Sequence, residues 1–185
     1  KNMKRIFFLT ALIVVSLFIG VWCATYGYQL FLNKLTFRTF TGKTEQVVSN
    51  PIVFQSIGKE ILLLSDFKGK YVVLDFWSST CGVCIEKFPK TQKLYEKYND
   101  NPSVIVYSVF CRIDKKGETV QIGSQILTER GYTFPVLSID MNDPALKEIG
   151  VTAFPPVIVF DMDGKLIFRG HIGDALKYLG ELTGD

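Results

Sequence analysis

Two cysteines separated by two residues, Cys81 and Cys84, are the clearest candidates for chemistry in this chain of 185 residues. They lie between a long apolar run and a segment with helical spacing, so the first turn of a helix would carry both. In that position their sulfurs can meet in a disulfide. The unpaired amides and the dipole of a helix start favour a thiolate, which is the form of cysteine that attacks a disulfide. The pattern predicts a redox dithiol in which Cys81 is the nucleophile and Cys84 the resolving thiol.

The same spacing also occurs in zinc sites, where a second pair of ligands completes a set of four. The remaining candidate ligands here are Cys23, Cys111 and His171. Cys23 lies in an apolar N-terminal run, and the other two are isolated in sequence. We therefore expect neither a metal nor an organic cofactor. Cys111 is interpreted as a buried thiol that packs as a small apolar side chain, and His171 as a surface residue beside the last strand.

The elements that position the two cysteines follow from the spacing of the apolar residues. Continuous apolar runs predict strands over residues 71–77, 103–110 and 134–139. Apolar spacings of three and four predict a helix over residues 84–98, kinked at Pro89. Shorter helices are predicted over residues 118–130, 143–149 and 174–182, the second of them capped by Asp143. Hairpins are predicted over residues 52–64 and 157–168. Strands that alternate with helices indicate a mixed α/β sheet that is covered on both faces.

The net charge of +3 comes from the N-terminus, where Lys1, Lys4 and Arg5 are the only charges before Lys34. The rest of the chain is neutral, which argues against a body that binds nucleic acid through a broad basic field. The uncharged residues 6–28 are long enough to span a bilayer. We expect a cytoplasmic segment at 1–5, an uncleaved transmembrane signal-anchor at 6–28, a tether at 29–50 and one domain at 51–185.

The positive-inside rule places that domain on the extracytoplasmic side of a bacterial membrane, as a single-pass protein with a periplasmic or outer-face domain. A cleaved signal peptide is the alternative interpretation of residues 6–28. Either arrangement exports the domain.

Three segments resemble the thioredoxin superfamily. The run from Val73 to Cys84 resembles its active-site segment, and Lys68–Trp77 looks like the TlpA/ResA-like, membrane-anchored branch. Gly150–Asp161, followed by Gly164, is similar to the superfamily's cis-proline segment and final hairpin. The resemblance covers roughly residues 51–173, and its motifs occur in the expected order.

The resemblance implies a thioredoxin-like fold, in which helices flank a central mixed sheet. An N-terminal β-hairpin and an extra helix and strand between Cys84 and Pro155 would be added to it. It also implies a monomeric thiol–disulfide oxidoreductase. Such an enzyme would act on disulfide-containing proteins and take electrons from another membrane or exported thiol protein. Reduction, for example in cytochrome c maturation, is the direction expected of this branch.

The resemblance also assigns roles to individual residues. Pro155 would follow a cis peptide bond and expose the backbone of Phe154 to a substrate chain. Trp77 would pack beneath the active-site turn and belong to the substrate-binding group. Asp75 falls where thioredoxin carries a buried acid that handles the proton of the resolving cysteine. The alternative for Asp75 is a strand residue whose side chain is bonded to the backbone.

The sequence departs from the family pattern at three places. Thr80 replaces the usual Trp before the first cysteine, the pair Gly82-Val83 has neither Pro nor His, and Pro156 replaces a common Thr. Two other classes remain open at this point. A peroxiredoxin-like peroxidase would need a Pro-x-x-x-Thr-x-x-Cys pattern that Cys81 lacks. A copper-binding protein of the SCO type would need a longer cysteine spacing, with His171 as a ligand.

Overall fold

The computed structural model describes residues 22, 27, 42–113 and 117–184. The compact unit that holds the sheet runs from Thr41 to Asp185. Within the described residues, no helix is both long enough and apolar enough to cross a membrane. The predicted span over residues 6–28 lies outside those residues except at Trp22 and Gly27, so it stays a prediction.

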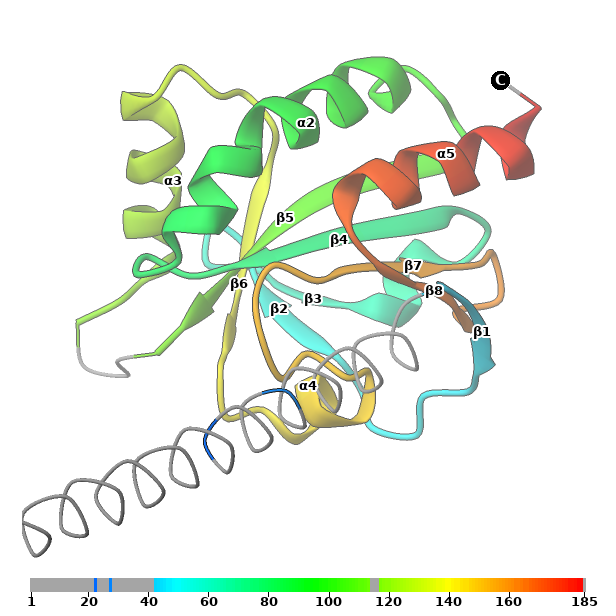
Figure 1. Ribbon diagram of the computed structural model, residues 1–185, viewed down its shortest axis with the longest axis horizontal. Coiled ribbons are helices and arrows are strands. Elements are labelled where there is room, and N and C mark those ends of the chain that lie inside the picture. The colour runs from blue at the N-terminus through cyan, green and yellow to red at the C-terminus, as the bar shows by residue number, and fades with distance from the viewer. Residues whose placement is uncertain (1–21, 23–26, 28–41, 114–116, 185) are drawn as a thin grey trace, which may run out of the picture. The chain divides into compact units, whose positions relative to one another are not determined.

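The described residues form one eight-stranded mixed sheet with the order β1-β8-β7-β4-β5-β6-β2-β3 (Figure 1). Its strands are β1 Gly42–Gln46, β2 Val53–Gln55, β3 Ile61–Leu63, β4 Tyr71–Trp77, β5 Val104–Arg112, β6 Val136–Asp140, β7 Val157–Phe160 and β8 Leu166–Gly170. Strands β4, β5 and β6 run parallel, and the other neighbours run antiparallel. The prediction of a mixed sheet with a hairpin near each end of the domain is confirmed.

Helices cover both faces of this sheet (Figure 1). They are α2 Gly82–Tyr98, α3 Val120–Glu129, α4 Pro144–Glu148 and α5 Ile172–Thr183, with a short 3₁₀ helix, η1, at Leu64–Phe67. Helix α3 and strand β6 fill the part of the chain between Cys84 and Pro155 where an extra helix and strand are expected. Helix α4 begins as predicted, with the Asp143 side chain accepting a hydrogen bond from the amide of Ala145.

Alternate side chains of β4 belong to different cores, because successive residues of a strand point to opposite faces. Val72 and Leu74 pack in the core that contains Leu146 of α4. Val73 packs in the core that contains Leu94 of α2 and Leu179 of α5. Asp75 and Trp77 follow Val73 at intervals of two and so share its side of the sheet. Strand β4 therefore places both residues beneath α2.

The structure corrects the expected tether over residues 29–50. Gly42–Gln46 forms strand β1, which pairs antiparallel with β8, and the Lys43 ammonium lies 3.0 Å from the Glu181 carboxylate of α5. This polar sequence has no apolar alternation to mark a strand. The pairing with the free edge of β8 decides its structure instead. Residues 29–41 lie outside the described residues.

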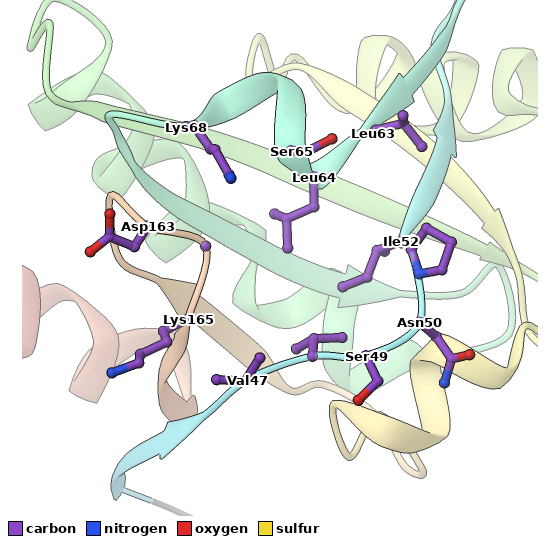
Figure 2. A pocket seen from close by; sticks show the side chains of 13 residues that line it. Val47, Ser49, Asn50, Ile52, Leu63, Leu64, Ser65, Lys68, Asp163 and Lys165 are labelled. Carbon is purple, nitrogen blue, oxygen red and sulfur yellow. The ribbon is translucent and has the colours of Figure 1, made fainter.

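A cavity of about 480 Å³ lies near the start of β4. Ile52 and Leu64 point into it, and Lys68, Asp163 and Lys165 gather on one of its sides (Figure 2). The cysteines follow the other end of β4, and a strand of seven residues spans roughly 20 Å. The cavity is therefore separate from the dithiol.

Candidate active site

Cys81 and Cys84 form a disulfide at the start of α2, with their Cα atoms 5.3 Å apart. The turn that leads into the helix is held by a hydrogen bond of 3.1 Å from the Cys81 amide to the Ser78 carbonyl. Cys81 is the N-cap residue of α2 and is partly exposed, whereas the Cys84 side chain is 2% exposed. The sulfur that a partner protein can reach is therefore that of Cys81, as the sequence predicts.

The helix start provides a donor for the Cys81 sulfur. The backbone amide of Cys84 donates a hydrogen bond of 3.2 Å to the Cys81 Sγ. The first turn of α2 contains no acidic residue. In the reduced protein, this amide and the helix dipole would stabilise a thiolate at Cys81.

The Phe154–Pro155 peptide bond is cis, as the resemblance implies. The segment that contains it lies beside the end of β4, because the Phe76 amide donates a hydrogen bond of 3.0 Å to the Pro156 carbonyl. The Phe154 side chain packs against the same core that contains Cys84 and that Cys81 also touches. The structure thus brings the proline segment and the disulfide together.

Trp77 lies under this site and is completely buried. Its ring packs edge-on against Phe88 of α2, with 5.0 Å between ring centroids, and at 4.9 Å against Phe110 of β5. It shares a core with Cys84. The expectation that Trp77 packs beneath the turn is confirmed. Its assignment to a substrate-binding group needs correction, since a side chain with no exposed surface does not touch a substrate.

Asp75 is 5% exposed and accepts a hydrogen bond of 2.6 Å from the Thr91 hydroxyl of α2. Burial raises the pKa of Asp75 from its usual 3.8 to about 6, and the Thr91 hydrogen bond and the charge of Lys87 oppose part of that rise. Cys84, Phe88 and Thr91 follow one another at spacings of four and three on α2 and are all buried. The Asp75 carboxyl group therefore packs against the face of α2 that carries the resolving cysteine. Its hydrogen-bond partner is a side chain rather than the backbone.

A family model described as Redoxin matches residues 54–175 of this chain. The chain belongs to the Redoxin family. Two relatives are proteins named thiol-disulfide oxidoreductase ResA. The one from Bacillus thuringiensis subsp. konkukian is 29% identical over 147 residues, which cover 80% of each chain. The one from Bacillus thuringiensis strain Al Hakam is 30% identical over 139 residues, which cover 72% of this chain and 75% of that protein.

Solved structures agree with this membership in fold. The thioredoxin domain of a thiol-disulfide oxidoreductase from Bacteroides vulgatus matches with a TM-score of 0.62 at 24% identity, covering 77% of this chain and 99% of that one. This Redoxin-family chain is thus a TlpA/ResA-like member of the thioredoxin superfamily and a thiol–disulfide oxidoreductase.

The sequence also singles out Cys111, His171, Thr80 and Val83, of which the last two are next to the cysteines in the chain. Cys111 is a free cysteine of β5 with no exposed surface, and burial raises the pKa of its thiol. His171 is partly buried and precedes α5 as its N-cap residue. Thr80 is exposed, and Val83 between the cysteines is 53% exposed. In the described part of the chain, no three His, Cys, Asp or Glu side chains are grouped to hold a metal ion.

Sequence reasoning missed two polar residues near the site of this Redoxin-family chain. The Ser79 hydroxyl, in the turn before Cys81, donates a hydrogen bond to the Glu118 carboxylate. The same carboxylate accepts a hydrogen bond of 2.6 Å from the Ile113 amide. Neither residue has a spacing that marks it, because the pair is joined only by the fold.

Proposed function

We propose that this protein reduces disulfides of exported proteins at the extracytoplasmic face of a bacterial membrane, through Cys81 and Cys84. The observation that carries the proposal is the partly exposed Cys81, whose sulfur lies at the start of α2 and is joined to the buried Cys84. The charges at Lys1, Lys4 and Arg5, followed by an uncharged run, support the location. The ResA relatives support the type of reaction.

The reaction proceeds in two exchanges that conserve thiols and disulfides. The Cys81 thiolate attacks one sulfur of the substrate disulfide, which forms a mixed disulfide and releases the other substrate sulfur as a thiolate. Cys84 then loses its proton and attacks the Cys81 sulfur, releasing the second substrate thiolate and leaving the disulfide that the structure shows. A thiol protein of the membrane or the exported compartment reduces this disulfide again. The dithiol carries both electrons, so the exchange requires no cofactor.

The surface around Cys81 is suited to an extended protein chain. Phe154 lies in the cis-proline segment and is partly exposed. We infer that its backbone pairs with the substrate chain. Val83 and Ile113 add apolar surface, at 53% and 48% exposure. Trp77 supports this surface from below.

The reduction potential of the Cys81–Cys84 pair tests the direction of electron flow. We expect a value nearer to that of thioredoxin, about −270 mV, than to that of the oxidant DsbA, about −120 mV. The measurement equilibrates the full-length chain with dithiothreitol mixtures and determines the free thiols by alkylation. A value close to −120 mV would make the protein an oxidant and overturn the proposed direction.

Asp75→Asn should slow the second exchange and change its pH dependence. Above pH 6 the wild-type carboxylate can accept the Cys84 proton, and below pH 6 it is already protonated. We expect the wild-type rate of mixed-disulfide resolution to fall as the pH drops through about 6. The variant should lack this inflection and be slower by about 10²-fold at pH 7. Stopped-flow measurement with a small disulfide substrate gives both rates.

The same substitution should stabilise the fold at neutral pH. The pKa of Asp75 is higher in the folded protein than its usual 3.8, so ionisation favours the unfolded chain as the pH rises from about 4 to above 6. Asp75→Asn removes this effect, which corresponds to about 3 kcal/mol at pH 7.5 and to about 0.5 kcal/mol at pH 4. Urea unfolding at the two pH values measures the difference in stability.

The kinetic prediction has its own contrary outcome. If the rate of mixed-disulfide resolution in Asp75→Asn keeps the pH profile of wild type, Asp75 is not the base that accepts the Cys84 proton.

A further inference from the structure

The Glu118 carboxylate joins two segments that border the redox turn. One of its oxygens accepts a hydrogen bond from the Ser79 hydroxyl, and the other accepts one of 2.6 Å from the Ile113 amide. Ser79 lies between β4 and α2, two residues before Cys81, and Ile113 directly follows β5. Glu118 itself lies two residues before α3, so a single side chain ties three elements together at the disulfide end of the sheet.

This contact acts on the turn that directly precedes Cys81. The Cys81 amide is bonded to the carbonyl of Ser78, the neighbour of Ser79, at 3.1 Å. In this disulfide-bonded arrangement of the turn, the Cys81 sulfur accepts a hydrogen bond of 3.2 Å from the Cys84 amide. Hydrogen bonds to an ionised carboxylate are stronger than neutral ones, and Ser79 and Glu118 are both only partly exposed. Glu118 is therefore placed to fix the conformation of the turn.

We propose that Glu118 is a positioning residue of the dithiol, which holds the turn before Cys81 through Ser79 and thereby sets the equilibrium between dithiol and disulfide. This inference rests on the proposed function of Cys81 and Cys84. The carboxylate acts on the equilibrium by keeping the turn in the arrangement that the structure shows with the disulfide formed. Holding the turn in that arrangement favours the disulfide over the dithiol, which makes the dithiol a stronger reductant.

Glu118→Gln tests the inference, because the amide keeps the size of the side chain and removes its charge. The full-length variant is equilibrated with reduced and oxidised dithiothreitol, and the Cys81–Cys84 disulfide is determined by thiol alkylation and mass spectrometry. We expect the ratio of disulfide to dithiol to fall by about fivefold relative to wild type, because a neutral amide holds the turn less strongly than a carboxylate. Glu129→Gln is the matched control, since it removes an exposed carboxylate from the far end of α3 that is bonded to Gln125. It should leave the ratio unchanged.

Ser79→Ala provides a second, smaller perturbation that keeps the charge. It releases the carboxylate from the turn, and we expect a fall of about twofold in the same ratio. The double variant should match Glu118→Gln alone, since Ser79 acts through Glu118. A residue that only stabilises the fold would lower the melting temperature without moving this ratio.

Two results would overturn this inference and leave the proposed function intact. One is a ratio in Glu118→Gln equal to that of wild type and Glu129→Gln. The other is a double variant whose effect is the product of two independent shifts. If the wild-type chain forms no Cys81–Cys84 disulfide in the same mixtures, the proposed function fails and the inference falls with it.

Discussion

Replacement of Cys81 by serine is expected to lower the rate of insulin-disulfide reduction by about 10³-fold or more. Cys81 carries the sulfur that is partly exposed and that receives the Cys84 amide at the helix start. A serine hydroxyl at this position is a poor nucleophile and forms no mixed disulfide. Cys84 cannot substitute for it, because its side chain is 2% exposed. The assay follows insulin precipitation with dithiothreitol as the electron donor.

Cys111→Ala is the control for this experiment. It also removes one thiol, but from a residue of β5 with no exposed surface and a raised thiol pKa. Its rate should equal that of wild type once the fraction of folded protein is matched. Activity in Cys81→Ser within tenfold of wild type would show that the exchange does not begin at Cys81.

Replacement of Cys84 by alanine is expected to stop the reaction after its first step. Cys81 keeps its position at the N-terminus of α2 and still attacks a substrate disulfide. The mixed disulfide then persists, because no thiol follows one helical turn later to attack it. We expect most of the reduced variant to carry a covalently bound substrate after mixing with an excess of a disulfide-containing protein, whereas wild type carries almost none. Electrophoresis without reductant measures the adduct.

The double variant Cys81→Ser/Cys84→Ala separates this trap from side reactions. It retains Cys111, and the adduct should be absent. An adduct of equal yield in the double variant would place the exchange at another cysteine. Multiple turnover by Cys84→Ala would show that a different group resolves the mixed disulfide.

Sequence reasoning predicts the centre of the fold and of the site well, because local signals mark both. The apolar run over residues 71–77 can bury the side chains on both of its faces only as a central strand, and it forms β4. Cys81 and Cys84 follow that strand within one turn, so their meeting depends on local helix geometry. Pro155 becomes informative only through the resemblance, since no periodicity marks a cis peptide bond.

Features that depend on contacts between distant segments of the chain cannot be predicted from such local signals. Gly42–Gln46 is polar, and its strand exists because β8 offers an edge. The resemblance assigns Trp77 to the substrate-binding group, but Phe88 and Phe110 enclose its ring. Ser79 and Glu118 are 39 positions apart and meet only when the turn before Cys81 lies beside the loop after β5. Such pairs carry no signal within either segment.

Disulfide exchange through Cys81 and Cys84 is tested most directly by identifying which cysteines become oxidised during the reaction. The fully reduced, full-length chain is mixed with a disulfide-containing protein, quenched with an alkylating reagent and mapped by peptide mass spectrometry. We expect the chain to lose two hydrogen atoms, Cys81 and Cys84 to be joined to each other, and Cys111 to be alkylated only after unfolding. A chain in which Cys81 and Cys84 remain alkylated while the substrate is reduced, or in which Cys111 is part of the disulfide, would contradict exchange through this pair.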